Sequence, residues 1–217
     1  ENINLSKTSE VAVLALSLKE QGHKIVNMAT GELSFKPAAS VRKAACRTIN
    51  KGETLYTQVA GLNKLRNVIG AKLKKDLEIE YKCDEIIVSN GGKQVIYNAL
   101  QGTINKGDEV IIISPYWVSY PEIIKLCGGK PKILNTTRRE GFSINTEKLE
   151  KLITSKTKWI ILNSPNNPTG VVYSTETIKK LVLVLRKYPD IWILSDEIYE
   201  KLNFSTESNL STVSYTH

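Results

Sequence analysis

Residues 158–170 read KWIILNSPNNPTG, an apolar run followed directly by a polar segment with two prolines and a glycine. A short, continuous apolar run bounded by turn residues is typical of a buried strand. Residues 175–187 then carry apolar side chains at helical spacing, and residues 191–195 form a second apolar run. Two strands joined through a helix are predicted to lie parallel in one sheet, because the helix returns the chain to the end where the first strand began.

The same alternation extends from this stretch towards the N-terminus. Apolar strands are expected at residues 86–89, 109–113, 131–134, 158–162 and 191–195. Helices are expected at residues 92–104, 117–126, 146–153 and 175–187. The pattern predicts an α/β fold with a mostly parallel sheet sandwiched by helices, and ligands of such sheets bind beyond the carboxyl ends of the strands.

The residues before this region have a different pattern. Helices are predicted over residues 9–22 and 38–50, and a third helix is predicted to follow Gly61. A short strand is expected at residues 25–29, between the first two helices. This part of the chain is therefore expected to be mainly helical.

Composition places the chain among ordinary globular proteins. Of its 217 residues, 41% are hydrophobic and 24% are charged, and no apolar run approaches the roughly 18 residues of a membrane-spanning helix. The formal net charge of +8 comes mostly from scattered lysines, a pattern that favours an anionic small substrate or plain solubility over a nucleic acid. Three cysteines without CxxC spacing indicate neither disulfides nor a zinc site, and no secretory signal is recognised, so a cytoplasmic protein without membrane attachment is predicted.

The ends of the first two strands carry residues that could bind a ligand. Gly91, Gly92 and Lys93 open a helix, where unpaired backbone N–H groups and the helix dipole favour a phosphate. The segment matches neither the Walker A motif nor GxGxxG, and a flexible turn between strand and helix is the alternative. Trp117 follows the second strand, where its ring could stack on a planar ligand or pack into the core.

The ends of the last two strands are more specific. Pro165 and Pro168 restrict the residues before them, which holds Asn167 in place as a donor for a ligand oxygen. Asp196 ends a buried strand, and a carboxylate there needs a partner, which could be a lysine or arginine, a metal ion or a protonated ring nitrogen. Tyr199 would share a helical face with it. No complete set of metal ligands is apparent, so no metal site is predicted.

Together these features describe a ligand with a planar ring, a phosphate arm, a ring oxygen and a basic ring nitrogen. Pyridoxal 5′-phosphate (PLP) has all four, and a protein that uses it must hold the phosphate, cover the ring and keep the ring nitrogen protonated. A nucleotide-binding α/β domain is the alternative.

Six motifs also give the chain a family resemblance over about residues 5–204. They are Gly31-Glu32, Tyr56-Thr57-Gln58-Val59-Ala60-Gly61 with Leu65-Arg66, Gly91-Gly92-Lys93-Gln94, Pro115-Tyr116-Trp117, Asn166-Asn167-Pro168-Thr169-Gly170 and Asp196-Glu197-Ile198-Tyr199. In this order they resemble the class I/II (fold-type I) PLP-dependent aminotransferases, in particular the bacterial aspartate aminotransferases. The resemblance implies transamination between L-aspartate and 2-oxoglutarate. An aromatic, prephenate, alanine or kynurenine aminotransferase is the alternative within the family.

The resemblance further implies a role for each matching residue. For the cofactor, these roles are phosphate binding by Gly91, Gly92 and Lys93, stacking on the ring by Trp117, hydrogen bonds to the phenolic oxygen from Asn167 and Tyr199, and pairing of the pyridinium nitrogen with Asp196. Gly31, Trp117 and Asn167 would contact the amino acid or 2-oxo acid substrate. The residue that matches Tyr56 reaches the phosphate of the neighbouring subunit in this family, which implies a homodimer with shared sites.

The chain departs from the family pattern in two places. Leu33 and Ser34 stand where relatives usually carry Pro and Asp. The family's Schiff-base lysine lies in a Ser-x-Ser-Lys run some way after the position of Asp196, and the residues that follow Asp196 here do not form that run. No catalytic lysine is therefore identified, and transamination by this polypeptide alone is not expected. A fragment of a longer enzyme is expected, with a truncated relative that binds PLP or dimerises without catalysis as the alternative.

The expected organisation has three parts. Residues 1–36 would contribute to a small domain and to the substrate site. Residues 37–204 would form an incomplete PLP-binding large domain. Residues 205–217 are rich in serine and threonine, and the alternation of strand and helix stops there, so a disordered tail is expected.

Overall fold

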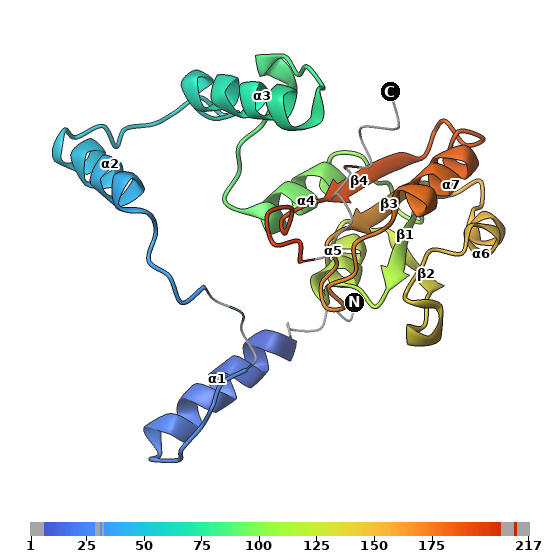
Figure 1. Cartoon of the computed structure of the whole chain (residues 1–217), viewed down its shortest axis with the longest axis horizontal. Helices are drawn as coiled ribbons and strands as arrows, with labels where there is room; N and C mark the ends of the chain where they lie inside the picture. Colours follow the sequence, from blue (N-terminus) through green and yellow to red (C-terminus); the bar gives the residue numbers. More distant parts are fainter. Residues whose placement is uncertain (1–6, 29–30, 32, 205–210, 212–217) are drawn as a thin grey trace.

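A four-stranded parallel sheet forms the centre of the protein. The computed structural model describes residues 7–28, 31, 33–204 and 211 (Figure 1). The strands of the sheet are β1 (Glu109–Ser114), β2 (Lys130–Asn135), β3 (Thr157–Asn163) and β4 (Trp192–Asp196). All pairs are parallel, and the order is β2-β1-β3-β4. The prediction of an α/β fold with a parallel sheet is therefore confirmed.

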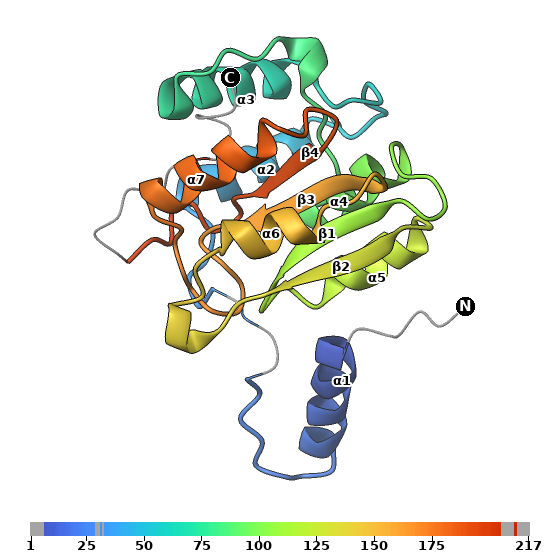
Figure 2. The ribbon, with the colours of Figure 1, turned by 90° about the vertical axis from the view of Figure 1, so that its right-hand side faces the viewer.

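Helices cover both faces of this sheet, as Figure 2 shows. On one face lie α6 (Thr146–Leu152) and α7 (Thr175–Leu185). On the other face lie α4 (Gly92–Gln101) and α5 (Ser119–Leu126). The predicted sandwich of helices around the sheet is thus present.

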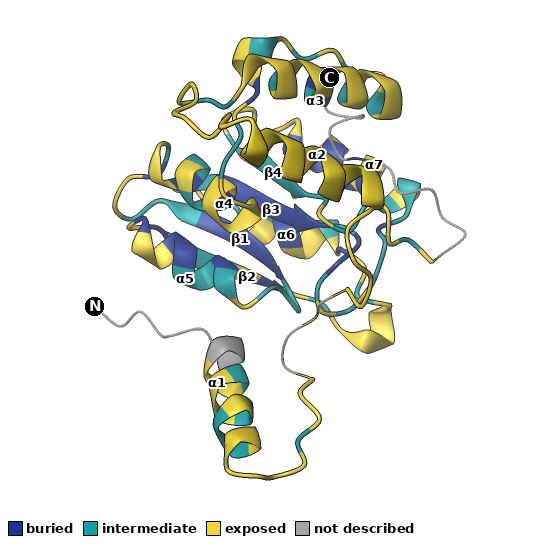
Figure 3. Cartoon of the chain, turned by 90° about the vertical axis from the view of Figure 1, so that its left-hand side faces the viewer, coloured by how far each residue is buried: buried dark blue, intermediate teal, exposed yellow. Residues whose placement is uncertain are grey.

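β1 shows why the strands are continuous apolar runs. Its successive side chains point to opposite faces. Ile111 and Ile113 pack in the core that α6 and α7 cover, whereas Val110 and Ile112 pack in the core that α4 and α5 cover. All four side chains are buried, and Figure 3 shows buried residues concentrated in the central strands β1 and β3. Because both faces exclude water, polar functional groups are confined to the strand ends.

The strand order produces a crevice at one edge of the sheet. From β1 the chain passes through α5 to β2 on one side, and it then returns through α6 to β3 on the other side of β1. The connections after β1 and β3 therefore leave in different directions at the carboxyl edge. Ligands of open α/β sheets bind at such a point.

Three helices precede the sheet: α1 (Lys7–Glu20), α2 (Ala39–Asn50) and α3 (Asn63–Leu77). Figure 1 shows α1 and α2 apart from the sheet, and no residue of α2 is buried. Two short 3₁₀ helices, η1 (Cys83–Glu85) and η2 (Arg138–Glu140), complete the described elements. None of the described helices has the length and apolarity needed to cross a membrane.

α3 is connected to the turn after β4 by ion pairs. The Nζ atom of Lys72 lies 2.9 Å from Oε1 of Glu200, and Nζ of Lys201 lies 3.2 Å from Oδ2 of Asp76. These side chains are partly exposed, so the pairs orient the two segments more than they stabilise the fold.

Two expected strands are absent from the described residues. Residues 25–28 form no strand, and Val26 and Met28 are almost fully exposed. Residues 86–89 are extended but unpaired, because their neighbour is a loop: the backbone N–H of Val88 donates to the carbonyl of Ala60 at 3.0 Å. An apolar run becomes a strand only where another strand lies alongside it, and neither run has such a neighbour among the described residues.

The expected tail, residues 205–217, lies outside the described residues except for Ser211. Ser211 is buried, and its Oγ donates to Oε1 of Glu197 at 2.5 Å. This residue therefore contacts the segment that follows β4.

Candidate functional site

A cavity of about 220 Å³ lies beyond the carboxyl ends of β1, β3 and β4. Its walls come from the start of α4, the connection between β1 and α5, the loop after β3 and the turn after β4. The lining residues are Gly92, Lys93, Ile96, Trp117, Tyr120, Asn163, Asn167, Asp196, Ile198 and Tyr199. The cavity thus occupies the crevice that the strand order produces.

The structure brings together most of the residues predicted to bind a ligand. The cavity contains Gly92, Lys93, Trp117, Asn167, Asp196 and Tyr199. Gly91 is the N-cap of α4, directly before the cavity wall. Gly31 and Tyr56 are exposed and do not line this cavity. The roles predicted for these two residues, towards the substrate and towards a neighbouring subunit, stay predictions.

The start of α4 is open to an anion. Gly91 has a φ of +87°, which glycine adopts without strain, and a Cβ atom built on Gly91 or Gly92 would meet nothing within 4 Å. The backbone N–H groups of Gly92 and Lys93 have no hydrogen-bond acceptor among the described residues. Free N–H groups at a helix N-terminus attract negative charge.

Asp196 is held by neutral donors. Its Oδ2 accepts a hydrogen bond from Oη of Tyr120 at 2.6 Å, and its Oδ1 accepts a longer one from the backbone N–H of Ile198 at 3.3 Å. Nδ2 of Asn163 donates to the backbone carbonyl of Asp196 at 2.9 Å. No ion pair among the described residues involves Asp196. The sequence left a lysine or arginine, a metal ion and a protonated ring nitrogen as possible partners of Asp196. Among the described residues, no lysine or arginine pairs with it.

Asn167 and Tyr199 lie next to each other in the cavity wall. Nδ2 of Asn167 is 3.3 Å from Oη of Tyr199. The backbone N–H of Asn167 donates to Oδ1 of the buried Asn163 at 2.8 Å, so Asn163 connects the loop after β3 to the end of β4. Tyr199 sits in a turn rather than in the helix that the sequence suggested, yet it still lines the same cavity as Asp196.

Trp117 and Lys93 form the aromatic and cationic part of the wall. The Trp117 ring makes an edge-to-face contact with Tyr120, with centroids 5.4 Å apart and planes at 84°. Nζ of Lys93 lies 5.2 Å from the Trp117 ring centroid, within range of a cation–π contact. Lys93 is the one basic residue in the described lining.

Several lining residues had no role predicted from their sequence pattern. Burial, followed by the charge of Asp196, raises the pKa of the Tyr120 phenol well above its ordinary value, so Tyr120 stays a neutral donor. Its position three residues after Trp117 was a usable signal, since residues at this spacing share a helix face. Asn163 is a polar residue at a strand end, but nothing in the sequence around it indicates its hydrogen bond to Asp196. Ile96 and Ile198 carried no signal beyond their apolar character.

The lining combines groups of complementary chemistry. It offers an uncompensated carboxylate, an aromatic ring, two adjacent donors and free N–H groups at a helix start. Such a set suits a planar anionic ligand with a basic ring nitrogen.

Comparison with known proteins agrees with this chemistry. A family model described as "Aminotransferase class I and II" matches residues 23–216. The "Probable aspartate/prephenate aminotransferase" of Rhizobium leguminosarum bv. phaseoli is 44% identical over 199 residues, which are 92% of this chain and 50% of that protein. The "Aspartate aminotransferase" of Bacillus subtilis is 44% identical over 206 residues, which are 95% of this chain and 52% of that protein. The chain spans about half the length of the curated relatives it matches.

Solved structures show the same relationship. The aspartate aminotransferase from Thermus thermophilus with maleate superposes with a TM-score of 0.94 at 37% identity, over 99% of this chain and 56% of that one. The family resemblance seen in the motifs is confirmed, since the family model covers most of the sequence. The chain therefore belongs to the class I and II aminotransferase family.

Proposed function

We propose that this chain provides the cofactor site of a PLP-dependent aminotransferase that transfers the amino group between L-aspartate and 2-oxoglutarate. The observation that carries the proposal is that Asp196, Trp117 and the open start of α4 line one cavity. The names of the relatives support the reaction class. The net charge of +8 suits dicarboxylate substrates.

The residues present fit PLP. The Cβ positions of Gly91 and Gly92 are unobstructed, which leaves room for a phosphate beside the free N–H groups of Gly92 and Lys93. Asp196 has no cationic partner among the described residues, so its charge is available to a protonated ring nitrogen. Trp117 offers a ring for stacking.

Each of these groups would have a defined task towards the cofactor. When bound, PLP supplies an electron sink that makes the proton on the α-carbon of an amino acid easier to remove. The carboxylate of Asp196 would keep a proton on the ring nitrogen, because an opposite charge close by favours the charged form. Nδ2 of Asn167 and Oη of Tyr199 would donate to the ring oxygen, and Trp117 would cover the ring and exclude water.

The substrate side of the proposal rests on other parts of the chain. Residues 1–36 would contribute to the substrate site through Gly31, and residues 37–204 would hold the cofactor. Trp117 and Asn167 would contact the substrate as well, since both face the cavity. Prephenate is the second candidate substrate, because the names of several relatives include it.

The proposal extends to a partner and a compartment. A second copy of the chain would complete the site through Tyr56, whose ring is fully exposed on the segment between α2 and α3. Free Cys46, Cys83 and Cys127 suit the reducing cytoplasm.

The test is a titration of PLP into the 217-residue chain, followed by equilibrium dialysis and by quenching of tryptophan fluorescence. We expect saturable binding that Asp196→Ala weakens by about ten- to a hundredfold, the loss expected for one charge-assisted hydrogen bond. Asp190→Ala removes an exposed carboxylate before the opposite end of β4 and serves as the matched control.

Two outcomes would overturn the proposal. One is the absence of saturable PLP binding in a folded chain. The other is equal PLP affinity of the Asp196→Ala variant, the Asp190→Ala control and the unaltered chain, because the carboxylate would then have no part in holding the ring. Binding of a nucleotide in place of PLP would favour the nucleotide-binding alternative.

A further inference from the structure

Tyr120 contacts both Asp196 and Trp117, the two residues that are proposed to hold the ring of the cofactor. Its Oη donates to Oδ2 of Asp196 at 2.6 Å, and its ring packs edge-to-face on Trp117. The side chain is only 2% exposed, so water does not compete for the hydroxyl. One buried residue therefore controls the orientation of both.

The two oxygens of Asp196 have unequal partners. Oδ2 has the short bond from Tyr120, whereas the bond that Oδ1 accepts from the backbone of Ile198 is 3.3 Å long. A carboxylate oxygen can accept more than one hydrogen bond. Tyr120 thus fixes the rotation of the carboxylate through one oxygen and leaves the other with capacity to accept.

The position of Tyr120 is itself rigid. It lies in the first turn of α5, and Ile123 and Ile124 of the same helix are buried against the sheet. Asn163 holds the backbone of Asp196 from the other side. The hydroxyl is therefore presented by a packed helix rather than by a mobile loop.

We infer that Tyr120 is a positioning residue for PLP. It holds the Asp196 carboxylate in the orientation in which the carboxylate accepts a hydrogen bond from the protonated ring nitrogen. This inference rests on the proposed function, since it needs PLP in the cavity. Tyr120 would then contribute to PLP binding through Asp196, without touching the phosphate itself.

The test compares Tyr120→Phe with the unaltered chain. The variant keeps the ring on Trp117 and removes only the hydroxyl. Tyr173→Phe removes the hydroxyl of a buried tyrosine from the core on the other face of the sheet and is the matched control. Two ligands are titrated: PLP, and its analogue in which a CH group replaces the ring nitrogen. Circular dichroism checks that each variant is folded.

We expect Tyr120→Phe to weaken PLP binding by about tenfold, the equivalent of one hydrogen bond to a charged group. Binding of the analogue should change by less than about twofold, because the analogue has no nitrogen for Asp196 to meet. In an Asp196→Ala background, Tyr120→Phe should have no further effect on PLP affinity, and Tyr173→Phe should leave both ligands unaffected.

Other results would overturn the inference in distinguishable ways. If the unaltered chain binds PLP and Tyr120→Phe binds it equally well, the inference fails while the proposed function stands. If the variant loses affinity for PLP and for the analogue to the same extent, Tyr120 only shapes the cavity, and the positioning role is wrong. If the unaltered chain binds no PLP, the proposed function fails and this inference fails with it.

Discussion

Asp196 illustrates at the residue scale how a strand end becomes a binding group. Its carboxylate accepts hydrogen bonds from Tyr120 and from the backbone of Ile198, and both donors are neutral. Neutral donors satisfy the oxygens without cancelling the charge, whereas a lysine would have done both. The site therefore keeps a negative charge that a cationic ligand group can use.

Tyr173 provides a prediction about pH at the same scale. Burial raises the pKa of its phenol from 10.0 to about 12. The folded state therefore holds this proton more tightly than the unfolded state, and the contribution to stability is complete below pH 10 and lost as the pH rises towards 12. Two pKa units correspond to about 3 kcal/mol in the free energy of unfolding.

Urea unfolding at a series of pH values between about 9 and 12 measures this effect, because this range spans the pKa of the phenol in the unfolded and in the folded state. The unaltered chain should lose more stability over this range than Tyr173→Phe, which has no phenol to ionise. Parallel pH profiles for the two proteins would show the prediction to be wrong.

At the scale of an element, substitutions at the start of α4 should affect the stability of the fold and the binding of PLP differently. Gly91 has a positive φ, so Gly91→Ala should lower the free energy of unfolding by about 1–3 kcal/mol through backbone strain. Gly92 has no such constraint, and a Cβ there meets nothing within 4 Å, so Gly92→Ala should leave stability unchanged or raise it by up to about 1 kcal/mol.

The affinity for PLP should respond to the Gly92 substitution differently from the stability. Gly92→Ala should weaken it, because the methyl group occupies the space through which a phosphate approaches the free N–H groups. Denaturant unfolding and PLP titration of the same two variants check both parts. Unchanged PLP affinity in a stable Gly92→Ala chain would rule out phosphate binding at this turn.

The elements also show where sequence patterns are sufficient. The runs predicted as strands at residues 109–113, 131–134 and 158–162 lie within β1, β2 and β3, and the run at 191–195 overlaps β4, which begins at Trp192. The two central strands, β1 and β3, contribute buried side chains to both cores. Residues 86–89 have the same apolar character but no neighbouring strand among the described residues. An apolar run alone therefore does not make a strand, because pairing depends on which segment lies alongside it.

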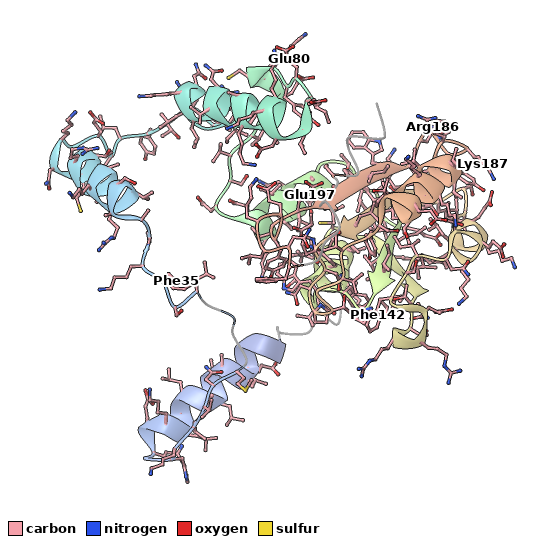
Figure 4. The ribbon with its side chains drawn as sticks, in the orientation of Figure 1. Phe35, Glu80, Phe142, Arg186, Lys187 and Glu197 are labelled. Carbon is pink, nitrogen blue, oxygen red and sulfur yellow. The ribbon has the colours of Figure 1, made fainter. Side chains whose placement is uncertain are left out.

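The exposed apolar residues before the sheet matter at the scale of the whole molecule. The most exposed of them, between 76% and 107%, are Val26, Met28, Leu33, Phe35, Leu55, Tyr56 and Val59. Figure 4 shows Phe35 on the connection between α1 and α2, away from the sheet. Apolar surface of this extent is typical of a protein interface.

We therefore expect the chain to sediment as a dimer whose dissociation depends on protein concentration. Tyr56→Ser combined with Val59→Ser should shift the equilibrium towards the monomer, because both side chains are fully exposed on the segment before α3. Leu183→Ser, on the exposed side of α7, is the control and should sediment like the unaltered chain. A monomer at every concentration tested would contradict the proposed homodimer.

The sequence by itself determined the alternation of strand and helix, the parallel sheet and the residues at the strand ends, because periodicity and turn chemistry are local properties of the chain. The motifs it contains were enough for the family. Only the tertiary structure decided that Tyr120 bonds Asp196 across 76 positions of the chain and that Asn163 connects the β3 loop to β4. These contacts depend on which helices and strands lie side by side, and a local pattern does not carry that information.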